Sequence, residues 1–469
     1  MSIDFFIVMK SELSLILLIF LLLFLKVWDG LKSNKTLLNG INILLLINFI
    51  IGFFDSPAST LFNGMFNHNS ILNTEKLLLN FGTLIISLQA YDWVKNHKHL
   101  LEFYILMLST LLGMFFMISA GNFLMFYLGL ELATIPLAAI VNFDLDKRKS
   151  SEAAMKMILL SAFSSGIMLF GISMIYGTTG TLNFSELPSL LTGGHLQILA
   201  LIFTFTGLAF KLSVVPFHLW TADVYEGAPV PITSYLSVIS KAAVVFVFIS
   251  VLNPLFVNIA NLWYNLLFLV IILTITVGNL FAIRQTNIKR FLAFSSIAQV
   301  GYILLGLSSG NQMGSTSAVY FLIVYLFSNL GIFGVVALIS AQTGKEDISN
   351  YRSFYKNNPT LSWVLAIALF SLAGIPPTAG FFGKMFLVTA GASHGNYILV
   401  SLVVLNMVIS LYYYLMIVKA IFVDANDEPL SKLIISWPMK LSFIICIIGI
   451  VATGFYSDLY EFINQLFKI

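Results

Sequence analysis

Long apolar runs recur along the whole of this 469-residue chain, and they constrain its fold more than any other feature. Most runs reach the length of about 20 residues that an α-helix needs to cross the hydrocarbon core of a bilayer. Short polar or Gly/Pro-containing loops separate them. Charged residues make up only 10% of the chain, whereas a soluble domain has about 25%. The sequence therefore predicts an all-α polytopic membrane protein.

We predict fourteen transmembrane helices from these runs. Their approximate bounds are 12–28, 37–54, 77–94, 100–119, 122–141, 151–176, 196–221, 231–252, 262–283, 288–308, 315–341, 360–390, 395–421 and 439–464. The loops after odd-numbered spans, with their flanks, hold 18 of the 24 Lys and Arg residues, and the opposite side has only Lys10, Lys76 and Lys468. Because Lys and Arg collect in cytoplasmic loops, we expect both termini on the non-cytoplasmic side.

Three lysines lie inside predicted spans, namely Lys211, Lys241 and Lys384, and Glu131 is the one clear carboxylate within a span. A lysine at bilayer depth costs about 2.5–3.5 kcal/mol, so keeping it requires a partner or a function. Glu131 is the natural partner for Lys211, which follows two spans later. We interpret these residues as a membrane proton or ion relay.

The same four residues also have a structural interpretation. The glutamate and the first two lysines could form ion pairs or polar contacts between helices. Lys384 lies nearer the outer end of a long span, so its ammonium could instead extend to the membrane interface.

Two further residues are supporting candidates. Lys156 follows Glu152 by four residues, a spacing that fits a surface helical pair as well as a role near Glu131. His218 suits proton transfer at neutral pH, but it could equally hydrogen-bond to a carbonyl that a helix break leaves free.

Prolines interrupt two of the predicted spans. Pro216 lies in the seventh, while Pro376 and Pro377 lie in the twelfth, shortly before Lys384. Interrupted helices in corresponding positions point to inverted repeats around an ion path, and here they are five spans apart. We therefore expect four segments: 1–99 with helices 1–3, 100–256 with a first repeat of helices 4–8, 257–425 with a second repeat of helices 9–13, and 426–469 with helix 14.

Other chemistries find no support in the sequence. Cys446 is the single cysteine, which excludes an internal disulfide and a cluster held by several cysteines of this chain. The sequence has no metal or nucleotide motif, and a net charge of +3 does not indicate nucleic-acid binding. Any redox chemistry is expected in other chains.

Several stretches together resemble a known family. They are LGLELATIPL around Glu131, GLAFKLSVVPFHLWTADVYEGAP around Lys211, the pair Ser240-Lys241, GNLFAIRQTNIKRFLAFSSIAQVGYILLG at 278–306 and AGIPPTAGFFGK at 373–384. From about residue 100 to 420 the chain is similar to the antiporter-like subunits of proton-pumping NADH:quinone oxidoreductase, respiratory complex I. In subunit L a long lateral helix follows span fourteen, whereas this sequence stops at Ile469. Subunit M has a glutamate where this sequence has Lys384. Both differences favour subunit N.

The resemblance implies a fourteen-helix subunit with broken helices 7 and 12. It implies that Glu131 pairs with Lys211 and that protons pass from Lys211 to Lys241 and on to Lys384. Partners would be the other membrane subunits, including neighbouring antiporter-like subunits, in a bacterial inner membrane. NADH, FMN, iron–sulfur clusters and quinone would be bound by partner subunits.

Other functions stay open at this point. A subunit of an Mrp-type cation/proton antiporter or of a hydrogenase-linked ion pump would use the same helices with another energy source. A stand-alone solute carrier would need more polar residues in the broken helices, and a purely structural scaffold would not need four buried ionisable groups.

Overall fold

The computed structural model of the chain describes residues 3–28, 33–54 and 56–468. Helices dominate this part of the chain, as predicted, and 13 of them are long and apolar enough to cross a membrane. Eleven are single α-helices: α2 (Lys10–Trp28), α3 (Asn34–Ile51), α4 (Ser70–Val94), α5 (Leu100–Ile118), α6 (Phe123–Val141), α7 (Arg148–Thr179), α9 (His195–Leu212), α15 (Ile288–Leu307), α16 (Gln312–Thr343), α20 (Tyr397–Phe422) and α21 (Trp437–Phe455). A twelfth, Val257–Ile283, joins the 3-10 turn η3 (Val257–Ile259) to α14 (Ala260–Ile283).

The remaining candidate span, Val230–Leu255, is a composite helix that contains two π-helical turns. It consists of α11 (Val230–Tyr235), η1 (Leu236–Ser240), α12 (Lys241–Val247), η2 (Phe248–Leu252) and α13 (Asn253–Leu255). The predicted twelfth span is two shorter apolar helices, α18 (Pro359–Ala373) and α19 (Ala379–Ala392). The count of fourteen spans therefore stays a prediction, while the all-α membrane fold is confirmed.

The other elements are short. They are α1 (Ile3–Val8), β1 (Ser59–Leu61), β2 (Phe66–His68), α8 (Leu187–Leu190), α10 (Leu219–Gly227), η3 (Val257–Ile259), η4 (Ile348–Tyr351), α17 (Phe354–Asn357) and α22 (Asp458–Leu466). The sequence prediction missed the β1–β2 hairpin, in which Ser59 pairs with His68. It also ran one span to residue 464, whereas α21 ends at Phe455 because the polar pair Ser457 and Asp458 starts a new helix.

The helix α4 begins at Ser70 instead of the predicted residue 77. This difference changes the position of two charged residues, Glu75 and Lys76, which the prediction left outside the span. Both are buried inside α4, and Glu12 of α2 is buried as well. The expectation that Glu131 is the one clear carboxylate within a span is therefore wrong.

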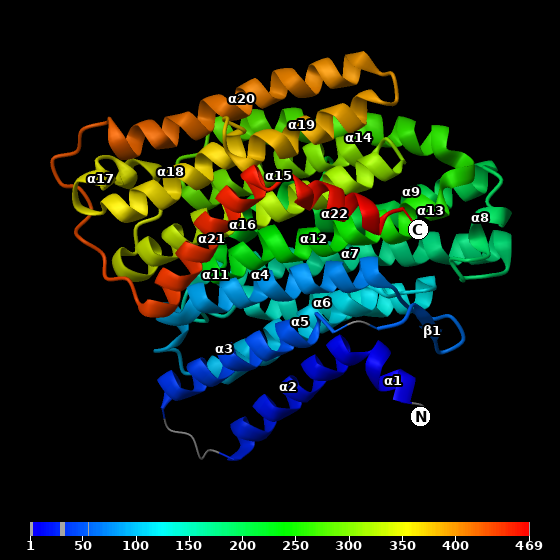
Figure 1. The fold of residues 1–469 in the computed structure, drawn as a ribbon, viewed down its shortest axis with the longest axis horizontal. Helices are drawn as coiled ribbons and strands as arrows, with labels where there is room; N and C mark the ends of the chain where they lie inside the picture. The colour runs from blue at the N-terminus through cyan, green and yellow to red at the C-terminus, as the bar shows by residue number, and fades with distance from the viewer. Residues whose placement is uncertain (1–2, 29–32, 55, 469) are drawn as a thin grey trace. The chain divides into compact units, whose positions relative to one another are not determined.

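The chain divides into two compact units. The first unit comprises 1–87, 93–211 and 239–260, and its α5 and α6 lie side by side (Figure 1). Two glycines allow this close approach: a Cβ on Gly113 would lie 2.3 Å from the backbone nitrogen of Ala133, and one on Gly129 would lie 2.6 Å from that of Met117. Small residues at such crossings are typical of helix packing in membranes.

The second unit comprises 88–92, 212–238 and 261–469. Its central helix is α16, which packs against α15, α18, α19 and α21 (Figure 1). Both α15 and α16 are buried along nearly their whole length. The side-chain amide of Gln89 donates to the Leu330 carbonyl of α16 over 2.8 Å, which connects residues 88–92 to this unit. The four-segment organisation predicted from the sequence stays a prediction.

Candidate functional site

Lys211 lies in the last turn of α9, directly before the first helix break. Its side chain is only 8% exposed. The helix ends because Ser213 adopts a left-handed conformation with φ of 62°, which is uncommon for a residue other than glycine. The C-terminal end of a helix carries partial negative charge, so this position favours a cation.

The carboxylate of Glu131, on α6, attracts the Lys211 ammonium electrostatically. Glu131 is itself partly buried, and its side chain interacts with Tyr127, one turn earlier on the same helix. The structure therefore brings the predicted pair within electrostatic reach. A carboxylate beside a buried lysine favours its charged form, whereas burial alone favours the neutral form.

Lys241 is the first residue of α12 and follows the π-helical turn η1 directly. Its side chain is 2% exposed, near the middle of the composite span. Single π-helical turns interrupt α-helices frequently at functional sites, because they change which side chain faces the interior. The sequence does not predict this turn, because residues 236–240 contain no proline or glycine.

Lys384 lies in α19 after the second break and is 4% exposed. Its ammonium donates to the Ala373 carbonyl, at the end of α18, over 3.1 Å and to the Ser410 hydroxyl over 3.4 Å. The ammonium also lies 5.2 Å from the centre of the Tyr302 ring. The expectation that Lys384 could extend to the membrane interface is wrong, because the break offers it a free carbonyl inside the protein.

The second break leaves little room beside Lys384. Gly374 ends α18 with φ of 82°, and a Cβ there would lie 3.0 Å from Cδ of Lys384. A Cβ on Gly380 would meet the Ser371 carbonyl oxygen at 1.6 Å. Both glycines are therefore required for the close packing of α18 on α19.

A polar network continues from Tyr302, and the sequence reasoning missed it. The Asn279 amide donates to the Tyr302 hydroxyl over 3.0 Å, and the Tyr413 hydroxyl donates to the Asn279 oxygen over 2.9 Å. Asn279 and Tyr413 are nearly fully buried. Their polarity within apolar runs is the one signal that could have marked them.

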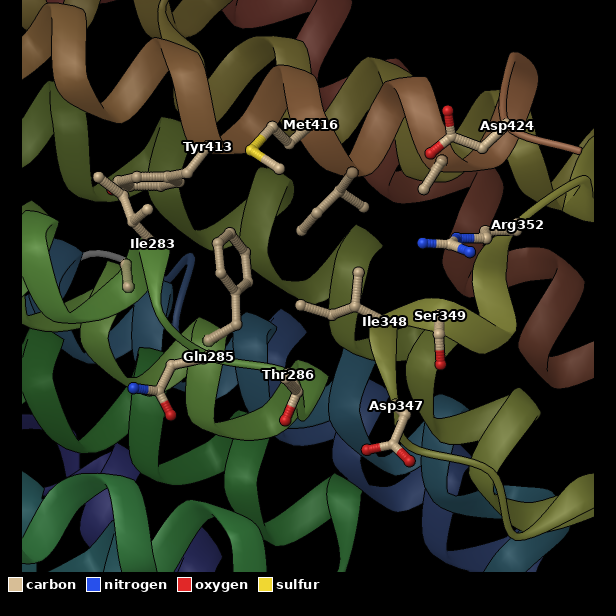
Figure 2. Close-up of a pocket in the computed structure, with 14 residues that line it drawn as sticks. Ile283, Gln285, Thr286, Asp347, Ile348, Ser349, Arg352, Tyr413, Met416 and Asp424 are labelled. Atoms are coloured by element: carbon tan, nitrogen blue, oxygen red, sulfur yellow. The ribbon is translucent and has the colours of Figure 1, made fainter.

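Tyr413 also lines a pocket of about 410 Å³. Asp347, Arg352 and Asp424 lie at one end of this pocket, and Tyr413 and Ile283 lie at the other (Figure 2). The pocket thus joins a charged, loop-borne end to the buried polar network.

The two supporting candidates are placed differently. Lys156 is 40% exposed and forms the surface helical pair with Glu152, with 2.8 Å between Nζ and Oε1. His218 is buried at the start of α10, two residues after Pro216. Both interpretations of this histidine stay predictions.

Comparison with known proteins gives the family. The family described as "NADH:quinone oxidoreductase/Mrp antiporter, TM" matches residues 120–410. The chain belongs to this family. It is also 48% identical to the NADH-quinone oxidoreductase subunit N of Phocaeicola vulgatus, over 97% of this chain and 98% of that protein. The resemblance to subunit N is therefore confirmed, and it extends through the first three spans.

Solved structures agree with the antiporter-like family. A chain of respiratory complex I from Thermus thermophilus with bound aureothin superposes with a TM-score of 0.80 at 25% identity, covering 96% of this chain and 98% of that one. A chain of the Mrp complex from Dietzia sp. has a TM-score of 0.84 at 18% identity, covering 99% of this chain and 97% of that one. The second likeness shows the shared antiporter-like fold alone.

Proposed function

We propose that this chain translocates protons across the membrane as the antiporter-like subunit N of an NADH-quinone oxidoreductase, driven by redox chemistry in other subunits. The observation that carries the proposal is the burial of Lys211 at the end of a broken helix with Glu131 acting on it. A buried ammonium without a function would be a net cost in a membrane protein. The similarity to subunit N supports redox chemistry in other subunits as the energy source for this transport.

The proposed relay runs from Lys211 to Lys241 and then to Lys384. Each lysine can hold a proton as an ammonium and release it as a neutral amine. The negative charge of Glu131 favours the ammonium form of Lys211. If Glu131 moved away, or if a positive charge from a neighbouring subunit compensated it, Lys211 would release its proton. The released proton binds the next lysine in the relay, which is neutral at that moment and becomes an ammonium. When the negative charge of Glu131 acts on Lys211 again, Lys211 takes up a new proton.

Redox cofactors are expected on partner subunits. We propose that NADH, FMN, iron–sulfur clusters and quinone bind there, and that this chain contacts neighbouring membrane subunits and lipid. The one thiol of this chain, Cys446, is buried in α21 and by itself cannot hold a cysteine-ligated cluster.

The direct test is reconstitution of the purified complex into vesicles. NADH oxidation by quinone is expected to acidify one compartment, and a protonophore should abolish the gradient. Sodium accumulation that survives the protonophore would contradict a proton relay.

The second candidate is a subunit of an Mrp-type cation/proton antiporter, which the fold of the Dietzia complex favours. Such an assembly would exchange cations for protons under an imposed pH gradient, without NADH. Copurification of this chain with subunits that oxidise NADH would decide against it.

We further propose that both termini lie on the non-cytoplasmic side of a bacterial inner membrane, because Lys and Arg collect in the opposite loops. Lys147, in the loop between α6 and α7, is a suitable labelling position, because its side chain is 69% exposed. A Lys147→Cys variant should react with an impermeant thiol reagent only from the cytoplasmic side. Cys446 is buried and should give little background. Reaction from the outside alone would reverse the topology.

A further inference from the structure

A second group of buried charges lies in the first unit, away from the lysines of the proposed relay in sequence. Glu12 of α2 and Lys76 of α4 form an ion pair with 2.5 Å between Nζ and Oε1. Glu75, the neighbour of Lys76, is equally buried, and no more than 2% of any of these three side chains is exposed. The Lys76 ammonium also lies 5.0 Å from the centre of the Phe66 ring.

Glu75 is connected to the helix that carries Lys241. The hydroxyl of Ser250 donates its one hydrogen to the Glu75 carboxyl group, whose two oxygens lie 3.1 and 3.3 Å from it. Ser250 belongs to the π-helical turn η2, nine residues after Lys241 in the same composite span. At the helical rise this is about 13 Å along the axis.

The charge inventory of these buried side chains is unbalanced. Two carboxylates face one ammonium, and Lys76 is already paired with Glu12. His68, in the adjacent hairpin, adds no positive charge at neutral pH, because burial and the charges of Lys76 and Lys10 lower its pKa to about 4. Lys10 is only partly buried and donates to Ser56 over 2.6 Å, on the hairpin side. The Glu75 carboxylate would be a third buried charge, without a counterion, and would cost roughly several kcal/mol. A proton bound to Glu75 removes this charge and its cost.

We propose that Glu75 is a proton-binding carboxyl group of the relay, placed between Lys241 and the membrane face on which the β1–β2 hairpin lies. Glu75 is in the second turn of α4, close to the hairpin, while Lys241 is near the middle of its span. The proton leaves the Lys241 ammonium, which becomes a neutral amine, is carried by water molecules along the helix segment between Lys241 and Ser250, and binds the Glu75 carboxylate, which becomes a neutral acid. Glu75 then gives that proton to water at the hairpin face and returns to its carboxylate form.

This inference rests on the proposed function, and it adds a second route for the proton of Lys241, an exit through Glu75 beside the transfer to Lys384. A merely structural Glu75 would accept a hydrogen bond from Ser250 and nothing more. The amide oxygen of glutamine can accept the same bond, so Glu75→Gln separates the two roles. The matched control is Glu461→Gln, which removes the charge of an exposed glutamate in α22.

The experiment uses the whole complex in vesicles, with assembled complex quantified in each variant. Glu75→Gln should assemble, transfer electrons and lower the ratio of protons pumped to electrons transferred, whereas Glu461→Gln should leave the ratio unchanged. Redox-induced infrared difference spectra should contain a carboxylic acid band that Glu75→Gln abolishes and Ser250→Ala shifts. A normal ratio in well-assembled Glu75→Gln would overturn the inference, and so would identical carboxyl bands in the wild type and Ser250→Ala.

A Lys241→Arg variant separates failure of this inference from failure of the proposed function. If Lys241→Arg loses pumping while Glu75→Gln keeps it, Glu75 is outside the relay and the relay stands. If both variants pump normally, the relay through Lys241 is also wrong.

Discussion

Lys211 and Lys384 are both buried lysines at helix breaks, but different groups stabilise their charges. Lys211 precedes its break and has the carboxylate of Glu131 acting on it. Lys384 follows its break, and in the described part of the chain a carbonyl, a hydroxyl and an aromatic ring contact it. A carboxylate can be moved or neutralised, whereas a backbone carbonyl is fixed. For the proposed relay, we therefore expect coupling to act at Lys211, and we expect Lys384 to keep a constant affinity for the proton.

The largest loss of assembled complex is expected from adding a side-chain carbon where α18 and α19 pack beside the second break. Gly380→Ala places a Cβ at 1.6 Å from the Ser371 carbonyl, so α18 and α19 must separate. Such overpacking costs about 1–3 kcal/mol or more, and we expect little assembled complex in the membrane. The control is Gly166→Ala in α7, where a Cβ meets nothing within 4 Å. Equal assembly of the two variants would show that the break is not rigid.

Removing the countercharge of Lys211 is expected to have the next largest effect. Glu131→Gln keeps the size of the side chain but removes the charge that favours the Lys211 ammonium. A neighbouring charge changes proton affinity about ten- to thousandfold, so we expect pumping to fall about tenfold or more. Proton-to-electron ratios in vesicles measure this effect, with assembly as the control. Normal ratios would mean that Lys211 does not depend on Glu131.

Removing one dipole beside Lys384 should have a small effect. Ser410→Ala deletes the hydroxyl 3.4 Å from the ammonium, while the Ala373 carbonyl remains. The loss should be about 0.5–1.5 kcal/mol in proton affinity or stability, with pumping reduced only slightly. Ser442→Ala is the matched control, because Ser442 is also buried and also donates to a carbonyl three residues earlier. A large loss in Ser410→Ala alone would put a sensitive step at Lys384.

The sequence allowed much of this comparison to be predicted. Apolar runs locate helices because each must match the bilayer thickness, and lysines within them are visible since they are rare there. The partners of Lys384 could not be predicted, because Tyr302 and Ser410 reach it only through helix packing. The burial of Lys76 could not be predicted either. A charged residue at the start of an apolar run indicates a loop, but α4 begins at Ser70, and Lys76 pairs with Glu12 of α2. Local patterns do not contain that information.

Lys241→Arg tests most directly whether the lysines carry protons as well as charge. A guanidinium keeps the charge and donates hydrogen bonds, but it does not release its proton in proteins. We predict that Lys241→Arg assembles in normal amounts and loses redox-driven proton uptake in vesicles, whereas Lys147→Arg, at an exposed lysine, pumps normally. Full pumping by a well-assembled Lys241→Arg complex would contradict the relay and leave Lys241 as a structural charge.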